Sequence, residues 1–115
     1  AAASARERFL DDGHQLLAIA ASNGHVDFTK LLQALAARGA NEVLVEAGPR
    51  LAGAFARQGL VDEFQLFMAA KFLGCNGRPL LDWPLAKMAD APSLKIVEMR
   101  AVGDDWRIIA VPLPA

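Results

Sequence analysis

The sequence predicts an α/β domain built on a mixed β-sheet, parallel in its first half and ending in an antiparallel hairpin. The first observation is that apolar runs alternate with amphipathic segments between residues 15 and 58, as in a parallel sheet with crossover helices. The second is a pair of strand-like segments near the C-terminus, joined by Gly103-Asp104-Asp105. The third is a hydrophobic content of 54% in 115 residues, enough for one core but not for two domains.

The first elements are predicted from periodicity and turn residues. A short helix over about residues 5–12 ends at Gly13, and the apolar run 15–20 is expected to be a buried strand. The segment Ser22-Asn23-Gly24-His25 has the composition of a turn. Together these features predict one helix and one strand before residue 27.

A second strand and two helices follow. Asp27 is predicted to cap a helix that runs to Arg38 and ends at Gly39. Its apolar positions recur at helical spacing: Phe28, Leu31, Leu32, Leu35 and Ala36. Residues 43–46 are expected to form a strand, and residues 49–58 a helix that ends at Gly59.

The second half is expected to complete the sheet. Residues 64–70 are apolar on both faces, which predicts a central strand. A loop of about a dozen residues follows at 71–82, and loops of that length are often functional. After an irregular stretch at 81–91, strands at 94–102 and 106–111 form the terminal hairpin. These strands supply few neighbours for a central strand, which suggests that further sheet lies upstream of Ala1 or comes from a partner.

Composition narrows the possible functions. The chain has 12 basic and 13 acidic residues and a net charge of −1, which argues against a general nucleic-acid binder. Cys75 is the single cysteine, so no internal disulfide is possible, and a reducing compartment is expected. No apolar run approaches the roughly 20 residues of a membrane span, and the first residues lack a secretory signal, so a cytoplasmic protein is expected. His14 and His25 have no acidic or cysteine partner at ligand spacing, so no metal site is predicted.

The strongest candidate site is the stretch 43–54, where an apolar run ends in Glu46 and a small-residue turn leads into a helix. Ligands of α/β proteins usually lie beyond the carboxyl end of a strand, and the free N–H groups of a helix start favour a phosphate. Arg50 adds a positive charge there. Glu46 suits hydroxyl groups, and a carboxylate that closes an apolar strand is costly unless it has partners.

Plainer interpretations of the same stretch stay open. Gly48 could serve only to adopt a positive φ, and Pro49 only to occupy the first helical position. The dinucleotide pattern G-x-G-x-x-G is absent. Lys71 and Arg78 could reach a substrate phosphate from the loop, although solvated positions are commoner for such residues.

Several linked motifs resemble the C-terminal part of the riboflavin-biosynthesis reductase domain. This domain belongs to the bifunctional diaminohydroxyphosphoribosylaminopyrimidine deaminase / 5-amino-6-(5-phosphoribosylamino)uracil reductases. The resemblance covers about residues 26–111. The matching motifs are Val45-Glu46-Ala47-Gly48, Leu51-Ala52-Gly53-Ala54, Gly59-Leu60-Val61-Asp62-Glu63 and Lys71-Phe72-Leu73-Gly74. Two departures are Ala70, where proline is frequent, and Arg50, where threonine is frequent.

The resemblance implies a dihydrofolate-reductase-like fold and NADPH-dependent reduction of the phosphoribosylaminouracil to its ribitylamino form. It implies that Glu46 contacts the substrate, and it assigns no catalytic residue. It also implies that one segment contacts the cofactor: Gly48, Pro49, Arg50, Leu51, Ala52, Gly53 and Ala54. A full domain of this kind has roughly 200 residues, so residues 1–115 are expected to be a single incomplete domain that is inactive alone and forms a homodimer.

Two rival functions stay open from the sequence. The chain could be a non-catalytic assembly module, because an incomplete sheet exposes an edge and an apolar surface. It could also be a reductase of a related pterin-type heterocycle with the same fold. A measurement of cofactor binding distinguishes the assembly module from the reductase. The identity of the substrate distinguishes the two reductases from each other.

Overall fold

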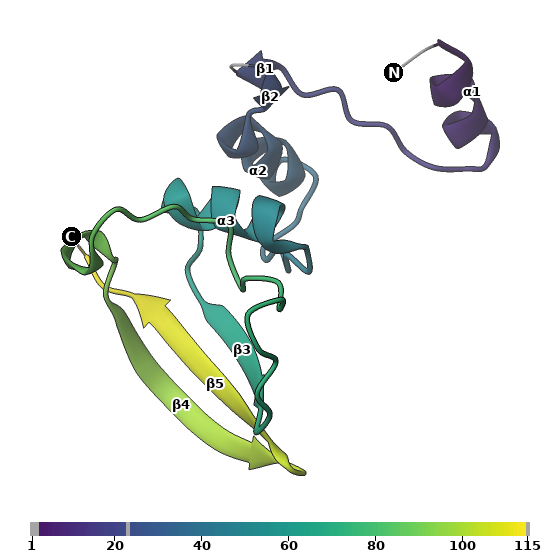
Figure 1. Ribbon diagram of the computed structural model, residues 1–115. Coiled ribbons are helices and arrows are strands. Elements are labelled where there is room, and N and C mark those ends of the chain that lie inside the picture. Colours follow the sequence, from purple (N-terminus) through teal and green to yellow (C-terminus); the bar gives the residue numbers. More distant parts are fainter. Residues whose placement is uncertain (1–2, 23, 115) are drawn as a thin grey trace. The chain divides into compact units, whose positions relative to one another are not determined.

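The computed structural model describes residues 3–22 and 24–114, and these fall into two compact units, Ala1–Val43 and Leu44–Ala115. Figure 1 traces the elements of each unit along the chain. The first unit holds two helices and a minimal hairpin. The second holds one α-helix, a three-stranded sheet and a long connecting loop. Each unit is described by itself below.

The first unit contains almost no sheet. Helix α1 spans Ala3–Asp11, and strands β1 (Ala21–Ser22) and β2 (His25–Val26) pair antiparallel over two residues each. Of the predicted turn between them, Asn23 lies outside the described residues. The prediction of a buried strand at residues 15–20 is wrong, because this segment has no strand assignment and joins no ladder among the described residues. An apolar run becomes a strand only where a partner accepts its backbone hydrogen bonds.

Helix α2 (Phe28–Ala36) follows the predicted pattern closely. The Asp27 carboxylate accepts a hydrogen bond from the Lys30 backbone N–H at 3.1 Å, so Asp27 is the predicted N-cap. The apolar residues Leu31, Leu32 and Leu35 are half-buried. The helix ends two residues earlier than predicted, but its glycine stop is confirmed: the Gly39 N–H donates to Ala36 O and the Ala40 N–H to Leu35 O.

The second unit begins with an irregular segment and then helix α3 (Pro49–Arg57). This helix ends in the same glycine motif, with Gly59 at φ +65° and the Leu60 N–H bonded to Phe55 O at 3.1 Å. The prediction of a strand at residues 43–46 is wrong, since this segment has no strand assignment and joins no ladder among the described residues. The predicted parallel half of the sheet is therefore not found among the described residues, where every strand pair is antiparallel.

The sheet of the second unit has the order β3-β5-β4, with β3 at Phe64–Ala69, β4 at Leu94–Val102 and β5 at Asp105–Pro112. The terminal hairpin is thus confirmed, and Figure 1 shows its long strands. The irregular stretch before it holds only the 3₁₀ turn η1 (Met88–Asp90). The predicted strand at residues 64–70 is confirmed as β3, but its predicted central position is wrong, because β3 lies at an edge among the described strands.

The strand register places apolar side chains from all three strands on one face of the sheet. Cross-strand partners point to the same face, and side chains alternate along each strand. The face comprises Phe64, Leu66, Met68, Leu94, Ile96, Met99, Trp106, Ile108 and Ala110. Ala110 is buried, but Ile96 is 59% exposed and Met99 49%. Among the described residues, the buried apolar side chains are only Phe55, Ala56 and Ala110.

The described part of the chain holds no helix that is both long and apolar enough to cross a membrane.

Candidate ligand site at the start of α3

The start of α3 presents its first backbone N–H groups without a side-chain acceptor. Gly48 occupies the N-cap position with φ −67° and ψ 169°, and it makes no side-chain capping bond. A positive φ is therefore not the reason for a glycine here. Pro49 takes the first helical position, as expected for a residue that has no N–H to lose. The site thus combines uncapped donors with the positive end of the helix macrodipole.

An open hollow of about 620 Å³ lies against this helix start. Its lining residues are Ala47, Gly48, Pro49, Arg50, Leu51 and Arg78. Two of them carry a guanidinium group, and none is acidic. Arg50 and Arg78 are both exposed, and neither forms an ion pair within the described ranges. Two cations and a helix start around one hollow favour an anionic group, and a phosphate fits the fork of an arginine.

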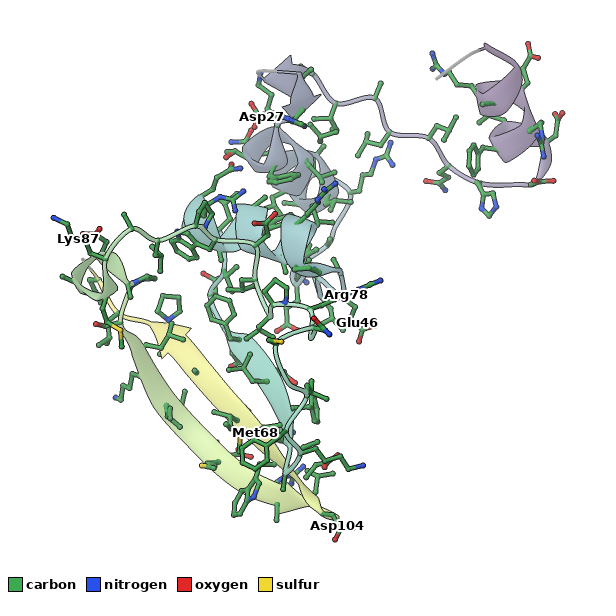
Figure 2. All side chains as sticks on the ribbon, viewed as in Figure 1. Asp27, Glu46, Met68, Arg78, Lys87 and Asp104 are labelled. Carbon is green, nitrogen blue, oxygen red and sulfur yellow. The ribbon has the colours of Figure 1, made fainter. Side chains whose placement is uncertain are left out.

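Glu46 lies two residues before the helix cap, and its carboxylate is exposed. Figure 2 shows its side chain and that of Arg78 at this end of α3. Within the described part of the chain, Glu46 has no hydrogen bond and no ion pair. The energetic argument from the sequence fails here, because an exposed carboxylate bears no burial cost. The carboxylate is instead free to accept hydrogen bonds from a ligand.

The predicted cofactor segment divides into two parts. The residues from Gly48 to Leu51 line the hollow, whereas Ala52 and Ala54 are half-buried and Gly53 is buried. A Cβ atom on Gly53 would lie 2.6 Å from the backbone oxygen of Asp82. The second half of the segment therefore packs against the protein's own loop.

The loop passes over α3 at Asp82, and the backbone of Asp82 forms two hydrogen bonds with residues of the helix. Its N–H donates to Pro49 O at 2.9 Å, and the Arg57 guanidinium donates to its backbone oxygen. Sequence reasoning did not single out Asp82. A signal was available, since glycine inside a helix costs about 1 kcal/mol relative to alanine and needs a packing reason.

The other residues considered from the sequence do not join the site. Lys71 and Cys75 are exposed on the loop and do not line the hollow. Asp62 is exposed, and the Glu63 carboxylate accepts a hydrogen bond from Gln65 Nε2 at 3.2 Å. The His14 ring lies 5.8 Å from that of Phe9. In the portion of the chain that the structure describes, no three His, Cys, Asp or Glu side chains are grouped to hold a metal ion.

Comparisons with known proteins agree on one family. The family model described as "RibD C-terminal domain" matches residues 3–108. The riboflavin biosynthesis protein RibD of Escherichia coli K12 is 46% identical over 90 residues, which are 77% of this chain and 24% of that protein. The 5-amino-6-(5-phosphoribosylamino)uracil reductase of Buchnera aphidicola subsp. Acyrthosiphon pisum is 31% identical over 91 residues, 78% of this chain and 44% of that protein.

A solved structure supports the same relationship. The Acinetobacter baumannii RibD structure, form 2, superposes with a TM-score of 0.85 at 28% sequence identity. The match covers 94% of this chain and 29% of that one. The chain thus spans about a quarter of the RibD proteins it matches and under half of the Buchnera reductase.

Proposed function

The chain belongs to the RibD C-terminal domain family, and from this premise we propose that it forms part of a riboflavin-biosynthesis reductase. The proposed reaction is the NADPH-dependent reduction of 5-amino-6-(5-phosphoribosylamino)uracil to its ribitylamino form. The Buchnera relative carries the name of this reductase. The dihydrofolate-reductase-like fold named by the resemblance belongs to the same proposal.

The observation that carries the proposal is the hollow at the start of α3. Arg50 and Arg78 line it together with the uncapped first turn. A dinucleotide brings two or three phosphate groups, and each needs donors of this kind. We therefore assign the phosphates of NADPH to this hollow, with Gly48, Pro49, Arg50 and Leu51 as the contacts.

When bound, the nicotinamide supplies the hydride, and the chain positions the two partners. Arg50 and the α3 amides hold the cofactor by its phosphates. Glu46 lies beside the hollow with an unpaired carboxylate and accepts hydrogen bonds from substrate hydroxyl or amine groups. A related pterin would offer fewer hydroxyl groups to this carboxylate than a ribosyl chain does.

We further propose that these residues are one incomplete part of the reductase domain. The apolar face of the β3-β5-β4 sheet is largely exposed, and both sheet edges are unpaired among the described strands. Large exposed apolar faces mark interaction surfaces. The rest of the domain is the proposed cover for this face, in a cytoplasmic homodimer that is active only when whole.

A chimera tests the proposed reaction and the role of Glu46 together. The matched residues of this chain replace their counterparts in the Buchnera reductase, and substrate-dependent oxidation of NADPH is measured. The chimera is expected to be active. Glu46→Gln is expected to lower turnover by about tenfold or more, because a hydrogen bond to a charged group contributes about 1.5–3 kcal/mol.

In the same host, NADPH affinity is expected to change less than about twofold in Glu46→Gln. Glu42→Gln, a change of another exposed glutamate, is the matched control and should leave turnover unchanged. A folded chimera without activity would contradict the proposed reaction. Equal turnover of Glu46→Gln and the unaltered chimera would remove Glu46 from the substrate site.

A further inference from the structure

The loop that follows β3 is held across α3 at one point. There the backbone of Asp82 lies against Gly53, so close that a Cβ on Gly53 would lie 2.6 Å from its oxygen and 3.0 Å from its nitrogen. Backbone atoms cannot yield as a flexible side chain can. Any larger residue at position 53 must therefore displace either the loop or the helix.

This crossing lies four residues from a cation of the proposed site. Arg78 belongs to the same loop and lines the hollow at the helix start. In chain order it lies between β3 and Asp82, whereas β4 follows Asp82. Residues 71–80 of the loop are exposed, and Leu81 and Trp83 beside Asp82 are half-buried. Among the described residues, the hydrogen bonds that join this loop to α3 are the two that Asp82 makes. The position of Arg78 thus depends on the position of Asp82.

We infer that Gly53 is a positioning residue: by admitting the backbone of Asp82 against α3, it places Arg78 beside the helix start as a second cation for the bound phosphate. Gly53 is itself buried by the loop and does not contact the ligand. The inference rests on the proposed NADPH site, but the crossing that it describes does not. It assigns different roles to the N-cap glycine of α3 and to the glycine inside the helix, with Gly48 at the ligand and Gly53 at the loop.

The first experiment needs no ligand and follows amide exchange in the 115-residue chain by NMR. In Gly53→Ala, exchange of the Asp82 amide is expected to accelerate about tenfold or more, because its bond to Pro49 O is broken. The Leu60 amide, bonded to Phe55 O at the other end of α3, is expected to keep its rate. The matched control is Gly48→Ala, whose new Cβ meets nothing within 4 Å. It should change neither rate.

A second variant covers the case in which Gly53→Ala disturbs α3 itself. Arg57→Met removes the side-chain donor to Asp82 O and leaves Gly53 in place. It is expected to accelerate Asp82 exchange as well, with Leu60 unaffected. An unchanged Asp82 amide in both variants would overturn the inference, whatever the chain binds.

The second experiment is a double-mutant cycle with NADPH as the probe. Arg78→Ala is expected to weaken binding about tenfold, the loss of one charge-assisted contact. Gly53→Ala is expected to weaken it similarly, and the double variant no further, because both changes remove the same contact. Losses that multiply in the double variant would mean that Gly53 acts independently of Arg78 and would overturn the inference. Absence of NADPH binding in the unaltered chain would contradict the proposed site and, with it, the role of Arg78 as a second cation. The exchange result would then decide only whether Gly53 holds the backbone of Asp82 against α3.

Discussion

The Arg50 side chain carries a full charge at the first turn of α3, beside amides that no side chain caps. Its five donors match the geometry of a phosphate, which a lysine or threonine at this position would match less well. Arg50→Ala is expected to weaken NADPH binding about tenfold while the fold stays intact. Calorimetric titration of the two proteins measures this difference.

A suitable control for Arg50→Ala is Arg38→Ala, which removes another exposed arginine, one that belongs to the first unit. It keeps the change in net charge the same. If both variants bind NADPH as the unaltered chain does, Arg50 is an ordinary surface residue and the assignment of the phosphates to this hollow is wrong.

Individual site residues were predictable where the chemistry is local. Pro49 at the first helical position and Asp27 as a helix cap follow from the residues themselves. Arg78 was considered from the sequence as a phosphate contact, but its place beside the start of α3 was not predictable, because it depends on a loop that returns to α3 some thirty residues later in the chain. The crossing at Asp82 that fixes this loop is a tertiary contact that no spacing rule contains.

At the scale of one element, α2 offers a direct test of the capping interaction. The backbone hydrogen bond from Lys30 lowers the pKa of Asp27, and the nearby Lys30 ammonium, 3.5 Å from the carboxylate, acts in the same direction. A lowered pKa means that this stabilisation is present above the ordinary carboxyl pKa and is lost as the pH falls through the folded-state value.

Asp27→Ala is expected to fray the first turn of α2 at neutral pH, whereas Asp27→Asn retains the cap. NMR shifts and amide exchange at Lys30 report the change. In the unaltered chain, the same loss is expected when the carboxylate is titrated with acid. If the NMR shift and the exchange rate of the Lys30 amide change neither on substitution of Asp27 nor on titration with acid, the capping role of Asp27 is wrong.

The elements with internal signals were predicted well, and those that need a partner were not. The three described α-helices end two or three residues before the predicted glycines, Gly13, Gly39 and Gly59, and the hairpin of β4 and β5 forms around the predicted turn. Residues 15–20 and 43–46 are apolar enough for strands but join no ladder that the structure describes; at the end of the first segment, Ala20 O accepts one backbone hydrogen bond, from the Asp27 N–H. Hydrophobic periodicity indicates which residues of a strand would be buried, but it does not indicate which other strand would pair with it.

At the scale of the whole molecule, the fold class was predicted in part. The antiparallel end of the sheet is present, and the described residues form no parallel strand pair. Because β3 is apolar on both faces, the sequence predicted that other elements would cover both faces and pair with both of its edges. The described residues do not supply all of these elements, and Phe67 is 67% exposed as a result. The same mismatch supports the proposal that this chain is one part of a larger reductase domain.

The most direct test of the account is a calorimetric titration of the 115-residue chain with NADPH, with its mass in solution recorded alongside. Binding with a Kd on the order of micromolar corresponds to about 8 kcal/mol, and the account predicts this result if the start of α3 forms the phosphate site. No binding by a folded chain that forms a dimer or a larger species would contradict it. That result would favour an assembly module.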